Sequence, residues 1–255
     1  MELTLQQCDS TNTEMKRIIE SGRFLPSGST VRAIAQTAGR GQRGNSWEAE
    51  PGKNLTFSIL LRPGGLLPRH HFLVSEAIAI ATASFLAGII GDSYKDTVKI
   101  KWPNDIYFGD RKIAGILIEN SLGMSGQILQ TIAGIGININ QQTFSDLIPN
   151  PISVRNIIGS DLDLDTLMPR ISRSVTAFVD SLAPIIASGT SLTDFESMYH
   201  SWLWRADGFY NWRDTASGEI FSAKIDKVMS NGQIILRLHD DNTIGYMFKE
   251  VEAVI

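Results

Sequence analysis

A glycine-rich segment between residues 38 and 47 carries side chains that could bind an anion. Its sequence, AGRGQRGNSW, has the spacing G-x-G-x-x-G, with Arg40 and Arg43 between the glycines and Trp47 behind them. Glycines let the backbone approach a ligand closely. Arginines offer fixed charge and paired donors to phosphate or carboxylate, and a tryptophan can cover a planar ligand. A surface loop with two solvated arginines would have the same sequence, so the segment alone leaves both interpretations open.

The same glycine spacing occurs in dinucleotide-binding turns, which lie between a strand and a helix whose N-terminus meets the pyrophosphate. The apolar stretch TVRAIAQ before the glycines predicts the strand. The residues after them, NSWEAEPGKNLTFS, contain a proline and a glycine and then predict a second strand instead of a helix. We therefore predict a long loop over residues 38–53 and disfavour a nicotinamide or flavin enzyme.

A second segment, KWPNDIYFGDRKIAGILIEN, places polar side chains at the ends of short predicted strands. Asn104 and Asp105 follow a proline at a turn, where they could reach a metal ion or a ribose, although the pair is also ordinary turn chemistry. Lys112 begins the next strand, and a lysine at a strand edge is common. Gly115 opens the backbone inside that strand, as often happens where a ligand approaches closely.

The segment GIGININ predicts a strand with two unlike faces. Alternation puts its isoleucines on one face and Gly134, Gly136 and Asn138 on the other. The apolar face would belong to the core, and the small polar face suits a strand that runs beneath a ligand. A bulge or tight sheet packing would also explain the glycines.

The segment DSTN, residues 9–12, offers hydroxyl and amide groups at the start of a predicted helix, STNTEMKRIIESG. Spacing predicts a capping box from Thr11 to Glu14 and a helix end at Gly22. Ser, Thr and Asp are ordinary N-cap residues. A helix N-terminus is also a ready site for a carboxylate, so this segment too has two interpretations.

These segments must be positioned by strands and helices, and the order of the predicted strands and helices indicates a large α/β domain followed by a small β domain. Apolar or alternating stretches predict strands at ELTLQQ, TVRAIAQ, NLTFSILLR, VKIKWP, DIYF, KIAGILIE and QILQTIAGIGININ. The turn GDR makes DIYF and KIAGILIE a hairpin. Further helices are predicted over residues 70–90, 163–187 and 191–203. Short strands predominate from about Asp207, so we divide the chain into residues 1–206 and 207–255.

Composition excludes several classes of protein. The 255 residues carry a formal charge of −4 and a pI of about 5.6, which disfavours nucleic acid as the main partner. The single cysteine, Cys8, excludes an intramolecular disulfide and a multi-cysteine zinc site. No secretory signal is present, and the longest charge-free apolar stretch, residues 77–91, is too short to span a bilayer. We expect a cytoplasmic protein that binds neither DNA nor a membrane.

Five of these segments together resemble, in type and order, the catalytic core of biotin protein ligases. They are DSTN, QTAGRGQRGNSW, KWPNDIY, RKIAGILIE and GIGININ. The resemblance covers essentially the whole chain. It implies a mixed α/β sheet packed with helices, as in class II synthetases, and an SH3-like C-terminal barrel. The implied reaction is ATP-dependent attachment of biotin to one lysine of a biotin carboxyl carrier protein, a subunit of acetyl-CoA carboxylase or a related carboxylase, through biotinyl-5′-AMP.

The resemblance also implies roles for individual residues. Lys112 and Arg40 would be the catalytic cations at the reacting carboxylate and phosphate. The residues implied to bind biotin are Ser10, Thr11, Asn12, Gln36, Gly39, Arg40, Gly41, Gln42, Lys112 and Gly115. The residues implied to bind ATP are Arg40, Arg43, Trp47, Asn104, Asp105, Lys112 and Asn138, with Asp105 as the Mg²⁺ contact. Positioning and charge can carry adenylation without a protein nucleophile, and the loop over 38–53 is the expected lid.

Two departures and two alternatives accompany this resemblance. Gln42 stands where the family often has a basic residue, so we expect weaker retention of the adenylate. Only nine residues precede Ser10, so we expect a single-function enzyme without the N-terminal helix-turn-helix domain of some members. A lipoate–protein ligase is disfavoured because its R-R-x-[ST]-G-G-G-A motif is absent, and a non-catalytic adenylate-binding regulator because Lys112 and Arg40 are both present. A homodimer is left open.

Overall fold

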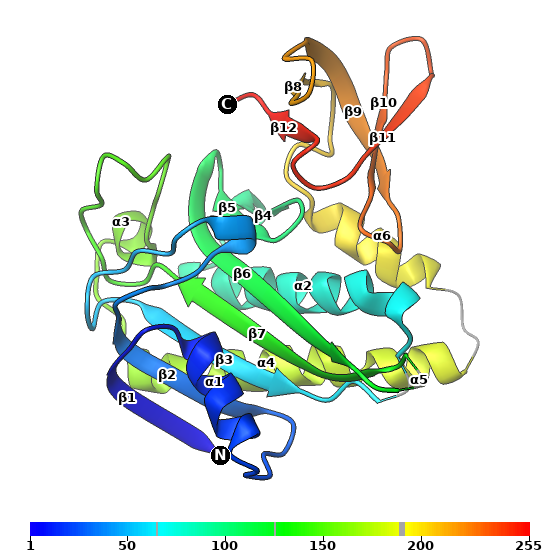
Figure 1. The fold of residues 1–255 in the computed structure, drawn as a ribbon. Coiled ribbons are helices and arrows are strands. Elements are labelled where there is room, and N and C mark those ends of the chain that lie inside the picture. Colours follow the sequence, from blue (N-terminus) through cyan, green and yellow to red (C-terminus); the bar gives the residue numbers. More distant parts are fainter. Residues whose placement is uncertain (65, 125, 189–191) are drawn as a thin grey trace.

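A mixed sheet of seven strands is the larger of two sheets in the computed structural model, which describes residues 1–64, 66–124, 126–188 and 192–255 except the side chains of Arg43 and Pro68 (Figure 1). The strand order is β1-β2-β3-β7-β6-β5-β4. The first pair is parallel and the other neighbours are antiparallel. The strands are β1 (Glu2–Cys8), β2 (Ser29–Gln36), β3 (Leu55–Leu61), β4 (Val98–Lys101), β5 (Asp105–Phe108), β6 (Arg111–Leu122) and β7 (Ile128–Ile137).

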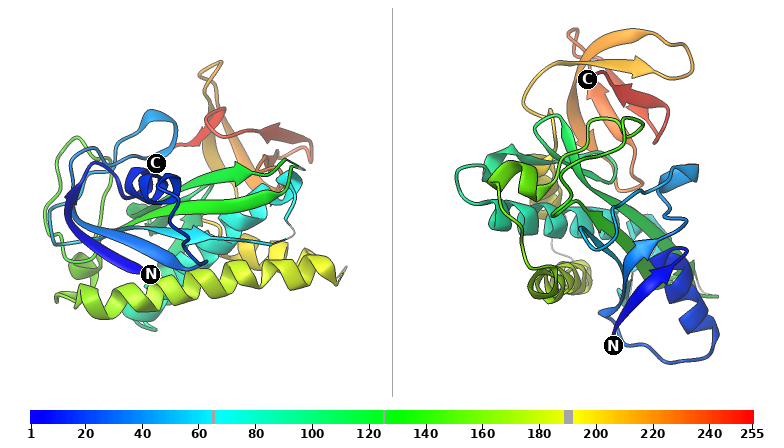
Figure 2. Two further views of the ribbon diagram at one scale, coloured as in Figure 1. Left: turned by 60° about the horizontal axis from the view of Figure 1, so that its bottom comes forward. Right: turned by 90° about the vertical axis from the view of Figure 1, so that its left-hand side faces the viewer.

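Helices cover both faces of this sheet. The α-helices are α1 (Thr11–Glu20), α2 (His71–Ile90), α3 (Val154–Ile158), α4 (Leu164–Asp180), α5 (Leu182–Ala187) and α6 (Thr193–Trp202), and the 3₁₀ helices are η1 (Gln42–Gly44), η2 (Pro68–His70) and η3 (Lys95–Thr97). Side-chain alternation sorts the strand residues between the faces. Leu60 and Ile132 pack with Met15 of α1, whereas their neighbours Ile59 and Ala133 join the core on the opposite face, which contains α2 and α4 (Figure 2).

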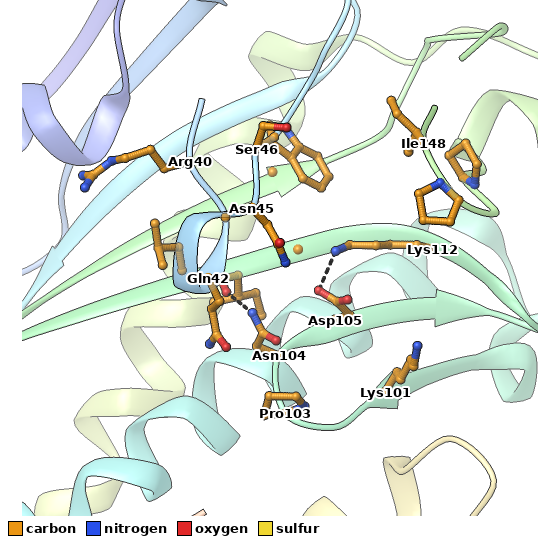
Figure 3. Close-up of a pocket in the computed structure, with 18 of the residues that line it drawn as sticks. Arg40, Gln42, Asn45, Ser46, Lys101, Pro103, Asn104, Asp105, Lys112 and Ile148 are labelled. Atoms are coloured by element: carbon orange, nitrogen blue, oxygen red, sulfur yellow. Dashed lines mark hydrogen bonds and ion pairs between the residues drawn. The ribbon is translucent and has the colours of Figure 1, made fainter. Parts of the chain in front are cut away.

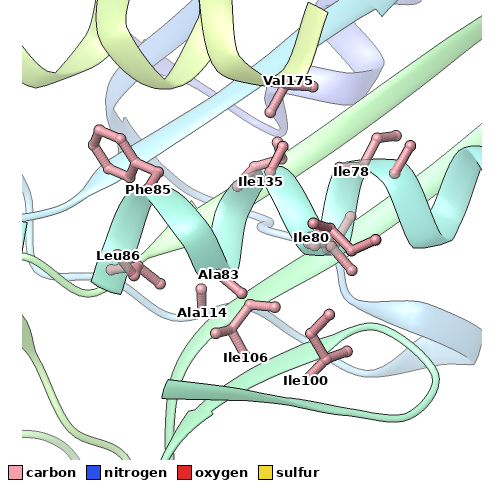
Figure 4. Close-up of a cluster of buried hydrophobic side chains, with 14 of the residues drawn as sticks. Ile78, Ile80, Ala83, Phe85, Leu86, Ile100, Ile106, Ala114, Ile135 and Val175 are labelled. Atoms are coloured by element: carbon pink, nitrogen blue, oxygen red, sulfur yellow. The ribbon is translucent and has the colours of Figure 1, made fainter. Parts of the chain in front are cut away.

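The helix α2 is the central element of the main core. Figure 4 shows its Ile80 and Ala83 beside Ile106 of β5, while Val175 of α4 lies on another side of the helix. Its length and composition would suffice to cross a membrane, but 78% of its most apolar window is buried inside the protein. The buried helix predicted over residues 70–90 is therefore confirmed.

The second sheet is small and lies at the C-terminal end of the chain (Figure 1). Its strands are β8 (Tyr210–Asp214), β9 (Ile220–Val228), β10 (Ile234–Arg237), β11 (Thr243–Tyr246) and β12 (Val251–Ala253), in the order β11-β10-β9-β8-β12. Buried residues of this sheet, such as Trp212 and Leu236, belong to the same apolar cluster as the main core. The division into domains at residue 206 stays a prediction.

Two local predictions were wrong. The helix α1 begins at Thr11, so its N-cap is Ser10, whose side chain makes no capping hydrogen bond. The predicted capping box from Thr11 is absent because the Thr11 hydroxyl lies 2.8 Å from that of Ser58 on β3. The single helix predicted over 163–187 is two helices, and Pro184 explains the break because it has no backbone N–H to continue α4.

Candidate active site

A row of paired residues crosses the large sheet on the face that carries α1. The strand register joins Lys101 of β4 to Asp105 of β5, Asp105 to Gly115 of β6, Gly115 to Gly136 of β7, and Gly136 to Thr56 of β3. The two glycines leave a gap in the side chains of this row. Only backbone lies beneath this gap, which we call the slot. Charged residues lie at one end of the slot and an uncharged hydroxyl at the other.

A second row lies two residues further along the strands and contains Leu117, Gly134 and Ser58. Asn12 of α1 packs onto it so closely that a Cβ atom on Gly134 would lie 2.4 Å from Asn12 Oδ1. The Ser58 hydroxyl is 2.5 Å from the same oxygen. The glycine face of GIGININ thus accepts a close approach, as the strand pattern indicated, but at Gly134 the approaching group is the protein's own Asn12.

The N-terminus of α1 forms a buried polar pocket above this second row. The backbone N–H of Thr11 donates to Gln36 Oε1 over 2.8 Å. Asn12 Nδ2 donates to Glu119 Oε2, also over 2.8 Å, and Lys16 Nζ lies 2.7 Å from Glu119 Oε1. Because Asn12 is only 1% exposed, these bonds fix its amide in one orientation.

Glu119 connects this pocket to the glycine-rich loop. Its Oε2 lies 3.4 Å from the guanidinium of Arg40. Burial alone would raise the pKa of the Glu119 carboxyl, but hydrogen bonds from Lys16 and Asn12 and the charge of Arg40 hold that pKa below its usual value. Figure 3 shows the Arg40 guanidinium pointing away from Lys112. The two predicted catalytic cations therefore have different carboxylate partners in this structure.

The glycine-rich loop folds back on itself and covers the slot. Arg40 and Ser46 form an antiparallel bridge, and Trp47 N donates to Gly39 O over 3.0 Å. A Cβ atom on Gly39 would lie 2.3 Å from the Trp47 carbonyl oxygen, so this turn requires glycine. The Trp47 indole rests directly on Gly136, where a Cβ atom would lie 2.3 Å from the ring.

Lys112 lies beside the covered slot. Its Nζ is 2.7 Å from Asp105 Oδ1 and 5.8 Å from the centre of the Trp47 ring. A Cβ atom on Gly115 would lie 3.4 Å from the same Nζ, so the glycine keeps room around the ammonium group. Lys112, Asp105 and the indole therefore form the charged end of the site.

The two asparagines predicted to serve ATP are bonded to the backbone of neighbouring segments. Asn104 Nδ2 donates to the carbonyl of Ile116 over 2.5 Å. Asn138 is 4% exposed, and its Nδ2 donates to the carbonyl of Ile152 over 3.1 Å. Both side chains thus hold the loops that border the site, and their contact with nucleotide stays a prediction.

A single cavity of about 960 Å³ brings most of the predicted site residues together. Its lining includes Ser10, Thr11, Asn12, Gln36, Arg40, Gly41, Gln42, Trp47, Asn104, Asp105, Lys112, Gly115 and Asn138. Gly39 does not line it, and the side chain of Arg43 lies outside the described part of the structure. The volume is at the upper end of the usual range for small-molecule sites.

Several residues of the site were missed in the sequence. Alternation along β6 from Gly115 reaches Glu119, and alternation along β3 puts Thr56 and Ser58 on one face, so both signals were present. No pattern in the sequence indicated that Lys101 or residues of the C-terminal sheet would line the cavity. The C-terminal residues that line the cavity are Trp212, Thr215, Ile225, Phe248, Lys249, Val251, Glu252 and Ala253.

The donor set can be tested for Mg²⁺. Within the described ranges, no group of three or more His, Cys, Asp or Glu side chains could hold a metal ion. Asp105 contributes one carboxylate, which it shares with Lys112. Mg²⁺ is commonly bound by one or two carboxylates together with substrate phosphates and waters. The site therefore fits an ion that arrives with a nucleotide better than a resident metal.

Residues 4–138 match the model of the biotin/lipoate A/B protein ligase family. Over 211 residues the chain is 33% identical to the biotin–[acetyl-CoA-carboxylase] ligase of Paracoccus denitrificans, with 79% of each chain covered. The chain belongs to this family. It is also 34% identical over 196 residues to the bifunctional ligase/repressor BirA of Escherichia coli K12. That match covers 73% of this chain and 57% of the relative, so the chain spans little more than half of that relative's length.

Solved structures of the ligase family share the whole fold. The biotin protein ligase from Aquifex aeolicus in complex with biotin and ATP superposes with a TM-score of 0.72 at 21% identity, covering 99% of this chain and 98% of that one. The ligase from Leishmania major in complex with biotinyl-5-AMP gives 0.62 at 18% identity, covering 96% and 98%. The predicted fold class, a mixed α/β sheet with helices and a small C-terminal β-sheet, is confirmed.

Proposed function

We propose that this chain is a biotin protein ligase, which joins biotin to a lysine of a biotin carboxyl carrier protein. In the first step a carboxylate oxygen of biotin attacks the α-phosphorus of ATP, and the bond to the β-phosphate breaks to release pyrophosphate. In the second step the neutral amine of the carrier lysine attacks the acyl carbon, the bond to the AMP oxygen breaks, and the nitrogen releases one proton to solvent as the amide forms. The named relatives support biotin over lipoate as the acid.

One observation carries this proposal most directly. A single cavity joins a buried polar pocket, lined by the uncharged side chains of Thr11 and Asn12, to the charged pair of Lys112 and Asp105. The two rows that carry these ends are two residues apart along the strands, or roughly 7 Å. Such a site suits an acid with a neutral polar head and a carboxylate at its other end.

The residues of the site would act through charge and position. Lys112 offsets the negative charge that gathers when a carboxylate meets the α-phosphate. Arg40 would exchange Glu119 for an anion of the substrate, bringing the glycine-rich loop over the ligand. With Trp47 in place, this loop would exclude water from the mixed anhydride. Asp105 would hold Mg²⁺ with the ATP phosphates, and the ion supplies charge neutralisation there when bound.

Exchange of labelled pyrophosphate into ATP tests the first step. We expect exchange that requires biotin, because the reverse reaction needs the adenylate. Lipoic acid in place of biotin is the matched control and should give no exchange. Exchange with lipoic acid but not with biotin would assign the chain to the other branch of the family. A cytoplasmic location stays a prediction, and a homodimer is left open.

A further inference from the structure

Lys101 is a second lysine of the cavity, at the far end of the charged row from the polar pocket. Its Nζ donates a hydrogen bond to the Tyr107 hydroxyl over 3.1 Å. The same ammonium lies 4.9 Å from the centre of the Tyr107 ring and 5.6 Å from that of Trp204. Two aromatic rings therefore hold Lys101 in a fixed, half-buried position against the cavity.

This ammonium has no ion-pair partner among the residues that the structure describes, in contrast to Lys16, Arg40 and Lys112. Asp105, the residue opposite Lys101 in the β4–β5 ladder, has an oxygen 2.7 Å from Lys112 instead. Burial lowers the pKa of Lys101 and the charge of Arg205 acts in the same direction, while Asp105 and Glu252 oppose the shift. A half-buried cation without a close carboxylate is stabilised by an anion that enters beside it.

The position in which the leaving group would depart predicts such an anion near Lys101. In phosphoryl and nucleotidyl transfer the attacking and leaving oxygens lie roughly in line across the phosphorus. Asn12 packs on Gly134 of β7 and Ser58 of β3 and also donates to Glu119 of β6, whereas Lys112 is paired with Asp105 on the next strand, β5. An acid that reaches Lys112 from the polar pocket would expel its leaving group toward β5 and β4, past Asp105 and toward Lys101 (Figure 3).

We propose that Lys101 binds the β- and γ-phosphates of ATP and the pyrophosphate that they become, while Lys112 acts on the carboxylate and the α-phosphate. This assignment rests on the proposed ligase function. It gives the two lysines different parts of the substrate to bind. Lys112 would face atoms that persist in the adenylate, whereas Lys101 would face only atoms that leave with pyrophosphate.

The variant Lys101→Gln tests this division, with Lys99→Gln as its matched control. Lys99 lies two residues away on the same strand, donates to the Ser201 carbonyl over 3.1 Å and does not line the cavity. Calorimetric titration with inorganic pyrophosphate should show about tenfold weaker binding to Lys101→Gln, in the range expected for one charge-assisted bond. The KM for ATP in pyrophosphate release should rise by a similar factor. Lys101→Arg should recover most of both losses.

The second half-reaction provides the discriminating readout. Transfer of biotin from pre-formed biotinyl-5′-AMP to a carrier lysine involves no β- or γ-phosphate, so Lys101→Gln should leave its rate within about twofold of wild type. Unchanged pyrophosphate binding in Lys101→Gln would overturn the proposal. Loss confined to the transfer step would also overturn it, because it would make Lys101 a proton acceptor for the carrier amine. If wild type shows no biotin-dependent exchange, the ligase function fails, and the pyrophosphate titration still decides the role of Lys101.

Discussion

At the scale of single residues, the cations assigned to the reacting carboxylate are both bonded to carboxylates of the protein. Arg40 is paired with Glu119 and Lys112 with Asp105. In the proposed reaction a carboxylate or phosphate of the substrate would compete with these partners, so binding would exchange one ion pair for another instead of burying an unpaired charge. The residue types were readable in the sequence, but the pairing of Asn12 with Glu119 was not, because 107 positions separate them.

The variant Lys112→Ala should nearly abolish adenylate formation and leave the fold intact. Removal of a charge-stabilising group from a reacting centre commonly lowers the rate on the order of 10² to 10³. Pyrophosphate release measures the effect, and circular dichroism checks the fold. Lys99→Ala, which removes a lysine that does not line the cavity, is the matched control. Release by folded Lys112→Ala within about tenfold of wild type would remove Lys112 from the chemistry.

At the scale of elements, the glycine-rich loop was predicted in position but not in form. Proline and glycine after the third glycine indicated a loop instead of a helix, and the structure confirms this over residues 38–53 except for the short η1. The return of the loop onto Gly136 depends on contacts between segments distant in sequence, which alternation along one strand cannot reveal. The helix α3 was missed although Ser153 and Asn156 form a capping box and Gly159 ends the helix in the left-handed region.

Hydrogen exchange should report the movement of this loop. With biotin and ATP at saturation, exchange of backbone amides between residues 38 and 53 should slow, because the loop would close on the ligand. Mass spectrometry of the corresponding peptides measures the change. In Gly136→Ala the new Cβ atom would collide with the Trp47 indole, so the loop should exchange faster without ligand. Equal exchange rates with and without ligand in wild type would contradict a lid.

At the scale of the whole molecule, the two sheets share one core and one cavity, which the sequence did not predict. Trp102 Nε1 donates to the Gly232 carbonyl over 3.0 Å, and the Trp102 ring meets Phe248 edge to face. The strands β9, β10 and β11 were predictable from their apolar patterns. The contribution of the C-terminal sheet to the cavity could not be predicted from the sequence, because it depends on packing between distant segments.

A buried carboxyl on α2 should make the stability of the whole chain depend on pH. Glu76 is 2% exposed, and its Oε2 has no hydrogen-bond partner among the described residues. Burial, assisted by the charge of Glu196, raises the pKa of Glu76 from 4.5 to about 8. The folded protein therefore favours the protonated, neutral form of Glu76. The stability of the fold is greatest with respect to this group below about pH 4.5, and it falls as pH rises toward about 8.

The variant Glu76→Gln should remove this dependence. At pH 7 it should be more stable than wild type by up to about 3 kcal/mol, from roughly 1.4 kcal/mol for each pH unit above the unfolded pKa. Urea unfolding of both proteins at pH 5 and pH 8 measures the difference, which should be larger at pH 8. The exposed Glu48 is a control position for the same substitution. Parallel pH profiles for wild type and Glu76→Gln would show that Glu76 is ionised in the folded protein without cost.

The most direct measurement of the central claim is the intact mass of a biotin carboxyl carrier domain after incubation with this protein, biotin and MgATP. We predict a mass gain of one biotinyl group on a single lysine, dependent on both small molecules and absent with Lys112→Ala. A carrier whose lysine is replaced by arginine should keep its mass. An unmodified carrier in the presence of folded wild-type protein, or a gain only when lipoic acid replaces biotin, would contradict assignment of the chain as a biotin protein ligase.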